Sequence, residues 1–476
     1  MFSIFRSTLR LGVAFCLVLG LSACREAERE YTDDGRLIVS YWEHWQGFEK
    51  EAMQAVVDDF NASQDRIFVK MLAVSQIEQK FVLATAGGVP PDIAGLWARH
   101  VAPFAEKGAL IPLGPYLAEA GITGDQYIPA IWDLVNYRGL TWALPSTPAS
   151  IGLHWNKRMF REAGLDPERP PRSLAELEAM NEVLTVVDVR RDGQTQRVRY
   201  TELTDAEKAD KDFDIVTMGF TPNEPGWWTG MNGYWFGAEL WDGERQLTAT
   251  TPENIAAVAW YAGYPEKYGV DNLKKFGASF GGNFASPQNP FLDERIAMVL
   301  QGVWMYNFID QFSPQLEWSA TAFPVDDPEA RPNTTIVDCD VLVIPRGAKN
   351  PDEAFEFIRF VNQQKNMEKL CLGQRKFSPL REYSDDFVQR HPHPYIELFI
   401  DLANSPNARL MPKLPVGEEY IAELLNAYSL AFGGLSTPED ALAYAGQRAQ
   451  WKFDRVNRRW DQTGEMRMRE WRGVDP

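Results

Sequence analysis

Between residues 37 and 97, short apolar runs alternate with stretches in which apolar residues recur every three or four positions. The runs LIVSYW, IFVKML and PDIAGLW predict three strands. FEKEAMQAVVDDF predicts a helix because Phe48, Ala52, Val56 and Phe60 fall on one face, and QIEQKFVLATAGG predicts a second helix that ends at glycines. Strands that alternate with helices in this way indicate a parallel sheet with helices on its faces, the α/β class.

The rest of the chain continues this alternation less regularly. GLTWALPSTPASIGLHW predicts a strand, a proline-rich crossing at Pro145–Pro148 and a second strand. Asp192 and Gly193 between two polar strands predict a surface hairpin. Thr251 is expected to cap a helix that has Pro252 in its first turn. CDVLVIP predicts a further buried strand, and the last sixty residues are expected to be largely helical.

Polar and aromatic side chains follow the first and third predicted strands. Glu43, His44 and Trp45 come after the first strand, and Trp97 and Arg99 come after the third. In open α/β sheets, ligands bind in the crevice beyond the carboxyl ends of the strands. We therefore expect these five residues to form one wall of a binding site.

The N-terminus reads as a targeting segment. Two arginines precede an apolar run from Leu11 to Leu21. This run is too short to cross a bilayer, which needs about 20 apolar residues, and it is typical of a secretory signal. The LSAC that follows resembles the lipobox of bacterial lipoproteins; the alternative is an ordinary cleaved signal. We expect residues 1–23 to be a signal peptide, Cys24 to carry a lipid that holds the protein at a membrane, and residues 24–35 to form a tether.

Charge and composition narrow the class of protein. The formal net charge is −18 at pH 7, and it becomes −20 without residues 1–23. A body of this charge is repelled by phosphate, which argues against nucleic acid as a partner. The chain is 45% hydrophobic and long enough for two lobes. No later segment is apolar enough to span a bilayer, so we expect a tethered body outside the cytoplasm, on the periplasmic side.

Few residues suggest metal or redox chemistry. Apart from the expected lipid-bearing Cys24, Cys339 and Cys371 are the cysteines left after the signal, and they could form a disulfide or be two separate buried thiols. His391 and His393 alternate with Pro392 and Pro394, which predicts a surface loop rather than a metal site. The chain contains no HExxH or phosphate-loop motif. We expect neither a metal nor a cofactor.

Several segments, in order, resemble the extracellular solute-binding proteins of bacterial ABC importers, in the branch related to maltose-binding protein. They are LIVSYWEHWQGFEKEA, ATAGGVPPDIAGLW, FAEKGALIPLGPYL, RGLTWALP, GLHWNKRMFREAGLDPERPPRSLAELEAM, NEPGWW, ERIAMVLQGVW and VLVIPRGAKNPDEAFEFIRFV. LHWNKRMFREAGLDP is the most diagnostic, and the resemblance spans residues 37–457. The chain departs from the family at VDCDV, where a glycine pair is common, and at Trp97, where the family commonly has a charged or polar residue.

The resemblance implies a two-lobed periplasmic-binding-protein fold of type II, with a mixed sheet flanked by helices in each lobe. Lobe 1 is then expected at residues 36–145 and 334–382, and lobe 2 at residues 146–333 and 383–476. The family binds one solute between the lobes by hinge closure, without chemistry, and delivers it to ABC permease subunits. We therefore expect a monomeric, non-enzymatic binding protein for a saccharide or polyol.

Binding of a sugar would explain the aromatic stretch EPGWWTGMNGYWFGAELW. A sugar ring has an apolar face that stacks on indole and a rim of hydroxyls that needs donors and acceptors. We expect Trp227, Trp228 and Trp235 in lobe 2 to face Trp45 and Trp97 in lobe 1. The alternative is that these bulky aromatics fill the core of lobe 2.

Further candidates follow from the family's pattern. Trp304 matches a position near the cleft, Glu224 begins the family's EP turn, and Asp338 and Arg375 lie at and beyond the second crossing between the lobes. Glu43 and His44 are expected to bond hydroxyls, and Arg99 to bind a polar rim. Core packing, helix capping and simple solvation are the alternatives for Trp304, Glu43 and Arg99. Asp92 is expected to bond backbone groups.

Two other functions stay open at this point. A secreted glycoside hydrolase needs two carboxylates that flank one bond, and Glu43, Glu224 and Asp338 could supply such a pair. A binding protein for another solute is the second alternative. An aromatic cleft with carboxylates also suits a cationic polyamine, whereas a glycerol phosphate would need several basic groups, and the sequence offers little beyond Arg99.

Overall fold

The computed structural model describes residues 29–280 and 284–473, and it confirms the predicted alternation at the start of the chain. The elements are β1 (Leu37–Glu43), α2 (Gly47–Ser63), β2 (Ile67–Ala73), α3 (Ile77–Ala86) and β3 (Ile93–Trp97). β1 pairs in parallel with both β2 and β3. The signal peptide and Cys24 lie outside the described residues.

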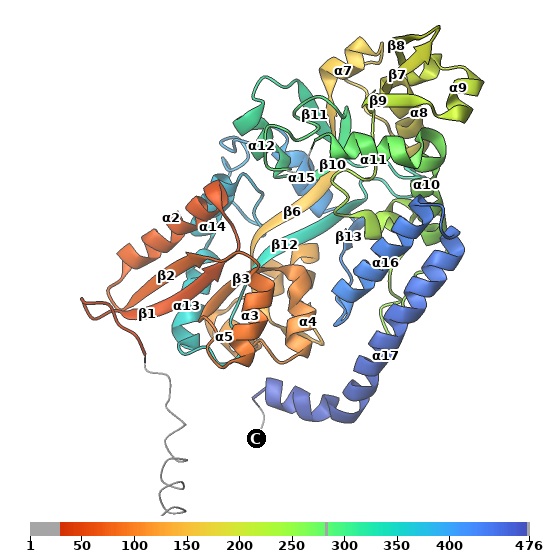
Figure 1. Cartoon of the computed structure of the whole chain (residues 1–476). Coiled ribbons are helices and arrows are strands. Elements are labelled where there is room, and N and C mark those ends of the chain that lie inside the picture. Colours follow the sequence, from red (N-terminus) through yellow and green to blue (C-terminus); the bar gives the residue numbers. More distant parts are fainter. Residues whose placement is uncertain (1–28, 281–283, 474–476) are drawn as a thin grey trace, which may run out of the picture.

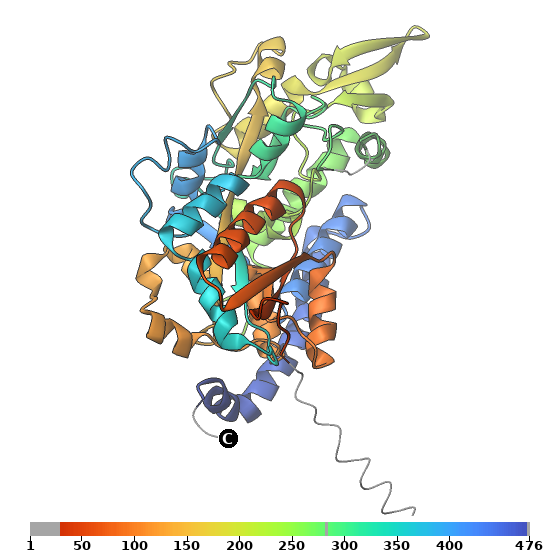
Figure 2. The same cartoon turned by 90° about the vertical axis from the view of Figure 1, so that its left-hand side faces the viewer.

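Two long strands organise the rest of the molecule. β6 (Ala143–Asn156) and β12 (Thr335–Val343) pair with each other and run through its middle (Figure 1). They join β1, β2 and β3 to β10 (Met298–Gly302) and β11 (Trp318–Thr321) in an eight-stranded sheet with the core order β10-β6-β12-β3-β1-β2. The described chain therefore forms two α/β bodies, one toward each end of the β6–β12 ribbon (Figure 2).

The proline-rich segment differs from its prediction. Pro145 and Pro148 do not interrupt the chain between two strands; they lie inside the single strand β6, whose 14 residues are all buried. β10 and β11 pair only with residues 151–156 of β6. The earlier part of β6 thus has a free edge, where a proline without an N–H is tolerated. In β12, the unusual VDCDV continues the strand with a register shift between Cys339 and Val341.

Asp92 has the backbone-bonding role predicted for it. Its Oδ2 accepts hydrogen bonds from the N–H and the hydroxyl of Ser40 at 2.8 Å, and its Oδ1 accepts one from Asn350 N–H at 2.9 Å. Asn350 directly precedes α13 (Pro351–Val361). The carboxylate therefore ties β1 to a helix more than 250 residues away in sequence.

The predicted hairpin is confirmed, and it gains a third strand. β7 (Val186–Arg191) and β8 (Gln194–Arg199) are joined by Asp192 and Gly193, both at positive φ. β9 (Phe213–Thr217) pairs with the other edge of β7. This small sheet projects from the upper end of the molecule in Figure 1.

The C-terminal part is helical, as expected. α15 (Ile396–Ala403) is followed by the short strand β13 (Ala408–Leu410) and then by α16 (Gly417–Phe432) and α17 (Pro438–Trp471). The first half of α17 packs into the core of lobe 2, but its end reaches lobe 1, where the rings of Trp471 and Trp142 meet edge to face at 4.8 Å. α17 thus contacts both bodies.

The remaining elements have the following bounds. They are η1 (Ala98–His100), α4 (Val101–Glu106), α5 (Gly114–Ala120), η2 (Gly124–Gln126), α6 (Pro129–Leu134), β4 (Asn136–Tyr137), β5 (Leu140–Thr141), α7 (Lys157–Glu162), α8 (Leu174–Leu184), η3 (Tyr200–Glu202), α9 (Asp205–Asp210), η4 (Thr229–Phe236), α10 (Pro252–Tyr268), α11 (Val270–Ala278), α12 (Met305–Phe312), α14 (Gln364–Gln374) and β13 (Ala408–Leu410). Thr251 caps α10 as predicted, because its side chain accepts a hydrogen bond from Asn254 N–H.

The structure also shows the state of the two cysteines, the burial of two histidines and the character of the helices. Cys339 and Cys371 are both buried and free. His391 and His393 are also buried, so the prediction of a surface loop at these residues is wrong. The His391 ring contacts Phe387, and the His393 ring contacts Phe399 and the distant Tyr306. Of the helices in the described ranges, none is both long enough and apolar enough to cross a bilayer.

Candidate ligand-binding cleft

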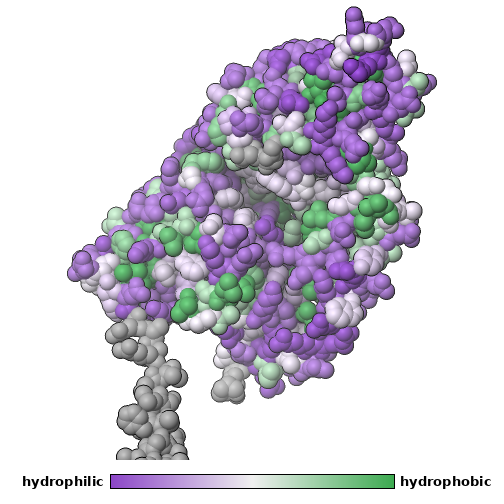
Figure 3. Space-filling view, viewed as in Figure 1, coloured by the Kyte–Doolittle hydropathy of each residue, from purple (hydrophilic) through white to green (hydrophobic). Residues whose placement is uncertain are grey.

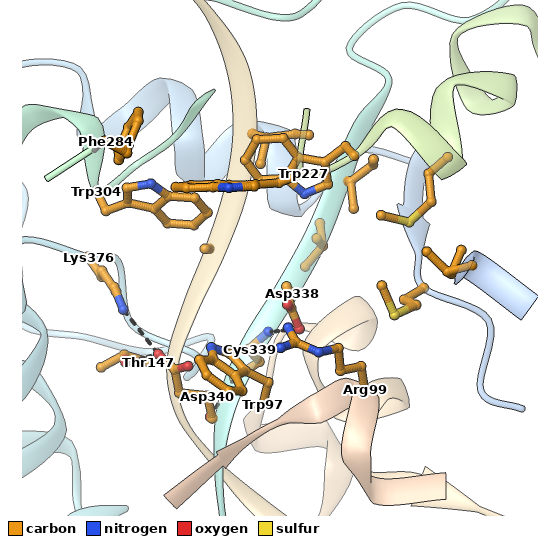
Figure 4. Close-up of a pocket in the computed structure, with 18 of the residues that line it drawn as sticks. Trp97, Arg99, Thr147, Trp227, Phe284, Trp304, Asp338, Cys339, Asp340 and Lys376 are labelled. Atoms are coloured by element: carbon orange, nitrogen blue, oxygen red, sulfur yellow. Dashed lines mark hydrogen bonds and ion pairs between the residues drawn. The ribbon is translucent and has the colours of Figure 1, made fainter. Parts of the chain in front are cut away.

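A cavity of about 750 Å³ opens where the two bodies meet β6 and β12 (Figure 3). Its walls come from distant parts of the chain: the loop after β1, η1, β6, the aromatic loop before η4, the start of α12, β12, and α16. In the close-up, Trp227, Trp304 and Phe284 lie on one side of the cavity, and Trp97 lies on the other side with labelled charged side chains such as Arg99 and Asp340 (Figure 4).

The lobe 2 wall consists of packed aromatic rings. Trp228 and Trp304 stack at 5.9 Å between ring centroids, and Trp227 meets Phe284 at 4.7 Å. Trp227 stays 49% exposed, although it is surrounded by other rings. An exposed indole on a packed aromatic support offers a flat apolar surface to a ligand.

The position of Trp304 depends on a glycine. Trp304 precedes α12, and its Nε1 donates a hydrogen bond to Gln301 Oε1 at 3.1 Å. Its ring lies so close to Gly302, the last residue of β10, that a Cβ there would come within 2.4 Å of the ring. A larger residue at 302 would therefore displace this indole from the wall.

The lobe 1 wall carries two tryptophans around a histidine. The His44 ring lies 4.2 Å from both Trp45 and Trp97, measured between centroids. Its Nδ1 lies 2.8 Å from Glu43 Oε1, and its Nε2 lies 3.5 Å from Asp340 Oδ1. Burial by itself would lower the pKa of His44, but the charges of Glu43 and Asp340 outweigh it and raise that pKa to about 10. His44 is thus a cation held beneath the two indoles.

A second buried cation forms the floor of the cavity. Lys376 is 2% exposed, and its Nζ lies 3.0 Å from Asp340 Oδ2 and 3.1 Å from Glu49 Oε1. It also lies over the Trp45 ring at 4.3 Å. Asp340 accepts a further hydrogen bond from the Thr147 hydroxyl at 2.9 Å. Burial favours the neutral carboxyl of Asp340, but Lys376 and His44 hold its pKa below the usual value.

The rim connects lobe 1 to α16. The Arg99 guanidinium lies 4.4 Å from the Trp97 ring, and its Nε lies 3.6 Å from Glu418 Oε1. His100 Nε2 lies 2.8 Å from the same Glu418 oxygen. Asp338 lies on the cavity wall near this rim, and burial raises the pKa of its carboxyl despite the nearby charge of Arg99.

The structure brings seven of the twelve expected site residues to the cavity surface. These are Trp45, Trp97, Arg99, Trp227, Trp228, Trp304 and Asp338. Glu43 and His44 lie directly beneath this surface, where Glu43 accepts hydrogen bonds from the N–H groups of His44 and Trp45.

Three expected residues lie elsewhere. Trp235 is fully buried in the core of lobe 2, against Phe323. Glu224 lines a small separate hollow behind Trp228, where burial raises its pKa to about 7. Arg375 points away from the cavity and pairs with Asp310 at 2.7 Å.

Several cavity residues were not predicted. Lys376, Asp340, Glu49, Thr147 and Glu418 supply most of its additional polar groups. Lys376 is adjacent in sequence to the predicted Arg375. The sequence therefore predicted the correct segment of the cavity wall but the wrong side chain within it. Nothing in the local pattern distinguishes the two, because which of them turns inward depends on carboxylates from β12 and α2.

Comparisons with known proteins agree with this geometry. The family described as bacterial extracellular solute-binding proteins matches residues 49–368. A binding protein of Brucella abortus (strain 2308) is 22% identical over 382 residues, which cover 78% of this chain and 82% of the relative. An sn-glycerol-3-phosphate-binding periplasmic protein of Yersinia pestis is 24% identical over 177 residues, 36% of this chain and 38% of the relative.

A solved structure of a protein with mannotriose bound is similar over the whole fold. It is 26% identical, covers 87% of this chain and 99% of its own, and superposes with a TM-score of 0.72. The two-lobed fold expected from the sequence is thereby confirmed. The chain belongs to the family of bacterial extracellular solute-binding proteins.

Proposed function

We propose that this protein binds a saccharide between its lobes and delivers it to the permease of an ABC importer. The observation that carries the proposal is the cavity itself, in which an aromatic wall with a half-exposed Trp227 stands opposite charged and polar groups around Trp45 and Trp97. Sugar rings present an apolar face and a polar rim to such a site. The similar structure that holds mannotriose supports an oligosaccharide as ligand.

The charges in the cavity favour a neutral ligand. Lys376 is already paired with Asp340 and Glu49, and Arg99 with Glu418. Neither cation is left free for a phosphate, which argues against glycerol phosphates. The ammonium groups of a polyamine could contact the indoles. Among the described carboxylates of the wall, however, only Asp338 forms no ion pair, so a polycation would find few acceptors.

The proposal includes binding without catalysis and a location outside the cytoplasm. The protein acts by hinge closure, without hydrolysing its ligand, and functions as a monomer outside the cytoplasm, tethered by a lipid on Cys24. In support, only Asp338 of the three carboxylates considered for a hydrolase pair lies on the cavity wall. Glu43 lies beneath the wall, bonded to the N–H groups of His44 and Trp45. Glu224 lines a separate hollow.

The test is a ligand screen on the chain from residue 25 to 476. Manno- and malto-oligosaccharides, spermidine and glycerol 3-phosphate are compared by calorimetry and thermal shift. A saccharide at 100 times its dissociation constant should stabilise the protein by about 2.7 kcal/mol. Recovery of the sugar with its linkage cleaved would show a hydrolase, and stabilisation by spermidine or glycerol 3-phosphate alone would contradict the saccharide proposal.

Substitution of Trp227 identifies the cavity as the site. Trp227→Ala removes a half-exposed stacking surface and should weaken saccharide binding roughly tenfold, since an aromatic contact contributes about 1.5 kcal/mol. The thermal midpoint should change little. Trp451→Ala is the matched control, because Trp451 on α17 is similarly exposed (57%) and does not line the cavity. Equal affinities of the two variants would place the ligand elsewhere.

A further inference from the structure

The end of α17 is basic, although the chain as a whole is strongly acidic. From Arg455 to Arg472 the sequence holds six arginines and three acids, in a protein of net charge −18. We call residues 455–472 the basic end of α17. It is distinct from the cavity, whose lining residues lie earlier in the chain.

Most acids of the basic end are neutralised by arginines from other segments. Asp461 pairs with Arg245 at 3.0 Å, and Glu470 pairs with Arg346 at 2.8 Å. Only Glu465 lacks an ion pair within the described part of the chain. The local surface is therefore more positive than the sequence of the helix alone indicates.

Five arginines of the basic end are exposed and form no ion pair with any described residue. These are Arg455, Arg458, Arg459, Arg469 and Arg472. Arg467 differs, because it pairs with Glu106 and anchors the helix to lobe 1. Met466 lies among the free arginines and is 64% exposed. The combination of free guanidinium groups with an exposed apolar side chain is typical of a surface that meets lipid headgroups.

The basic end lies at the same end of the molecule as the start of the described chain. Arg346 pairs with Glu470 of α17, and Lys349, three residues later, lies 3.7 Å from Glu30. Both views show the last turns of α17 and the first described residues at the same end of the molecule (Figures 1 and 2). A lipid on Cys24, as proposed above, would hold this end next to a membrane, since few residues separate Cys24 from the described chain.

We propose that the basic end of α17 docks on an anionic phospholipid surface. Most of the body is repelled by such a surface, so contact at this one end would orient the molecule. Long-range attraction to the headgroups needs no shaped pocket, and the free arginines are spread along an exposed helix. This proposal rests on the proposed lipid anchor only for the location of the membrane. The exposed arginines would attract anionic headgroups with or without the anchor.

The test measures binding of the lipid-free chain, residues 25–476, to vesicles. Phosphatidylglycerol mixed equally with phosphatidylcholine is compared with phosphatidylcholine alone by co-sedimentation. We expect binding to the anionic vesicles at about 50 mM salt and its loss at about 500 mM, where charges are screened within a few ångströms. Absence of binding to anionic vesicles at low salt would overturn the proposal.

A charge-matched pair of variants locates the contact. Replacing Arg458, Arg459 and Arg469 by Gln should weaken vesicle binding roughly a hundredfold. The control replaces Arg172, Arg190 and Lys274 by Gln, which changes the net charge equally at exposed lobe 2 residues without ion pairs in the described chain. Equal loss in both variants would show a net-charge effect and contradict a local docking surface. Both should keep the unfolding temperature and saccharide affinity of the parent.

A protein partner is the other outcome. If the basic end is required for association with permease-containing vesicles but not for binding to pure anionic lipid, the arginines contact an acidic protein surface, and the lipid proposal is wrong.

Discussion

Lys376 is the side chain on which the floor of the cleft depends. It is buried, and it joins Glu49 at the start of α2 to Asp340 in β12 while covering one face of Trp45. Removing one partner of a buried ion pair leaves uncompensated charge, which costs far more than loss of an exposed pair. This residue therefore links the stability of lobe 1 to the shape of the binding wall.

The substitution Lys376→Met should destabilise the protein by about 3–5 kcal/mol, because two buried carboxylates lose their cation. Urea unfolding measures the effect. Lys369→Met is the control, since Lys369 forms the exposed pair with Asp59, and it should cost less than about 1 kcal/mol. If the two variants unfold at the same urea concentration, the buried cation does not hold this floor together.

At the scale of single elements, β10 and the turn after it determine the position of Trp304 in the lobe 2 wall. The strand is buried along its whole length and ends at Gly302, two residues before Trp304. The close approach of the indole to Gly302 is possible only without a Cβ. The binding surface thus depends on the backbone of a strand that itself contributes no side chain to the cavity.

Gly302→Ala should weaken saccharide binding and lower the unfolding free energy by about 1–3 kcal/mol, because the Trp304 ring must move. Gly263→Ala in α10 is the matched control. A Cβ at Gly263 meets nothing within 4 Å, so the change should stabilise the helix by about 0.5–1 kcal/mol and leave affinity unchanged. Unaltered binding by Gly302→Ala would show that Trp304 does not contact the ligand.

At the scale of the whole molecule, three buried histidines make the fold sensitive to acid. His154 in β6 is fully buried, and its ring lies between those of Trp318 and Phe399. His391 and His393 lie in the segment that leads into α15. Burial lowers the pKa of His154 to about 3 and that of His391 to about 4, and it lowers the pKa of His393 as well.

Stability should fall as the pH drops below about 6.5. The histidines bind protons in the unfolded chain from about pH 6.5. In the folded protein, His154 and His391 bind protons only near pH 3 and pH 4, and the pKa of His393 is also lowered, so acid favours unfolding. His154 and His391 should each cost about 1.6 kcal/mol between pH 6.5 and 5. His44 acts in the opposite direction: its stabilisation is complete below pH 6.5 and is lost as the pH rises toward 10.

Urea unfolding between pH 7.5 and 5 measures this dependence. His154→Phe keeps an aromatic ring between Trp318 and Phe399 but cannot titrate, so its stability should fall less steeply with acid. The control His44→Gln should leave the acid limb unchanged. If His154→Phe has the same slope as the parent, this histidine is not the buried group that titrates.

Much of the fold could be predicted because it depends on neighbouring residues. The period of apolar positions gave the order of strands and helices from residue 37 to 97, and the Asp192-Gly193 turn gave the hairpin. The segments of the site could be predicted in the same way, because ligands bind beyond the ends of parallel strands. A turn residue, a cap or a period acts over a few positions, so the sequence shows it directly.

Burial was decided by the tertiary structure. Trp227 and Trp235 are eight residues apart in one aromatic loop, yet one is half exposed on the cavity wall and the other is fully buried. The two prolines of residues 145–148 lie within a strand because β12 covers only one of its edges there.

The charged floor of the cavity was also decided by the tertiary structure. His44 and Glu49 come from one stretch of the chain, whereas Asp340 and Lys376 come from two others, and nothing in the local sequence shows that these side chains meet. The sequence by itself determined the elements, their order and the chemistry available at their ends. Only the folded chain decided which side chains meet, because the free energy of burying a ring or a charge depends on partners that are distant in sequence.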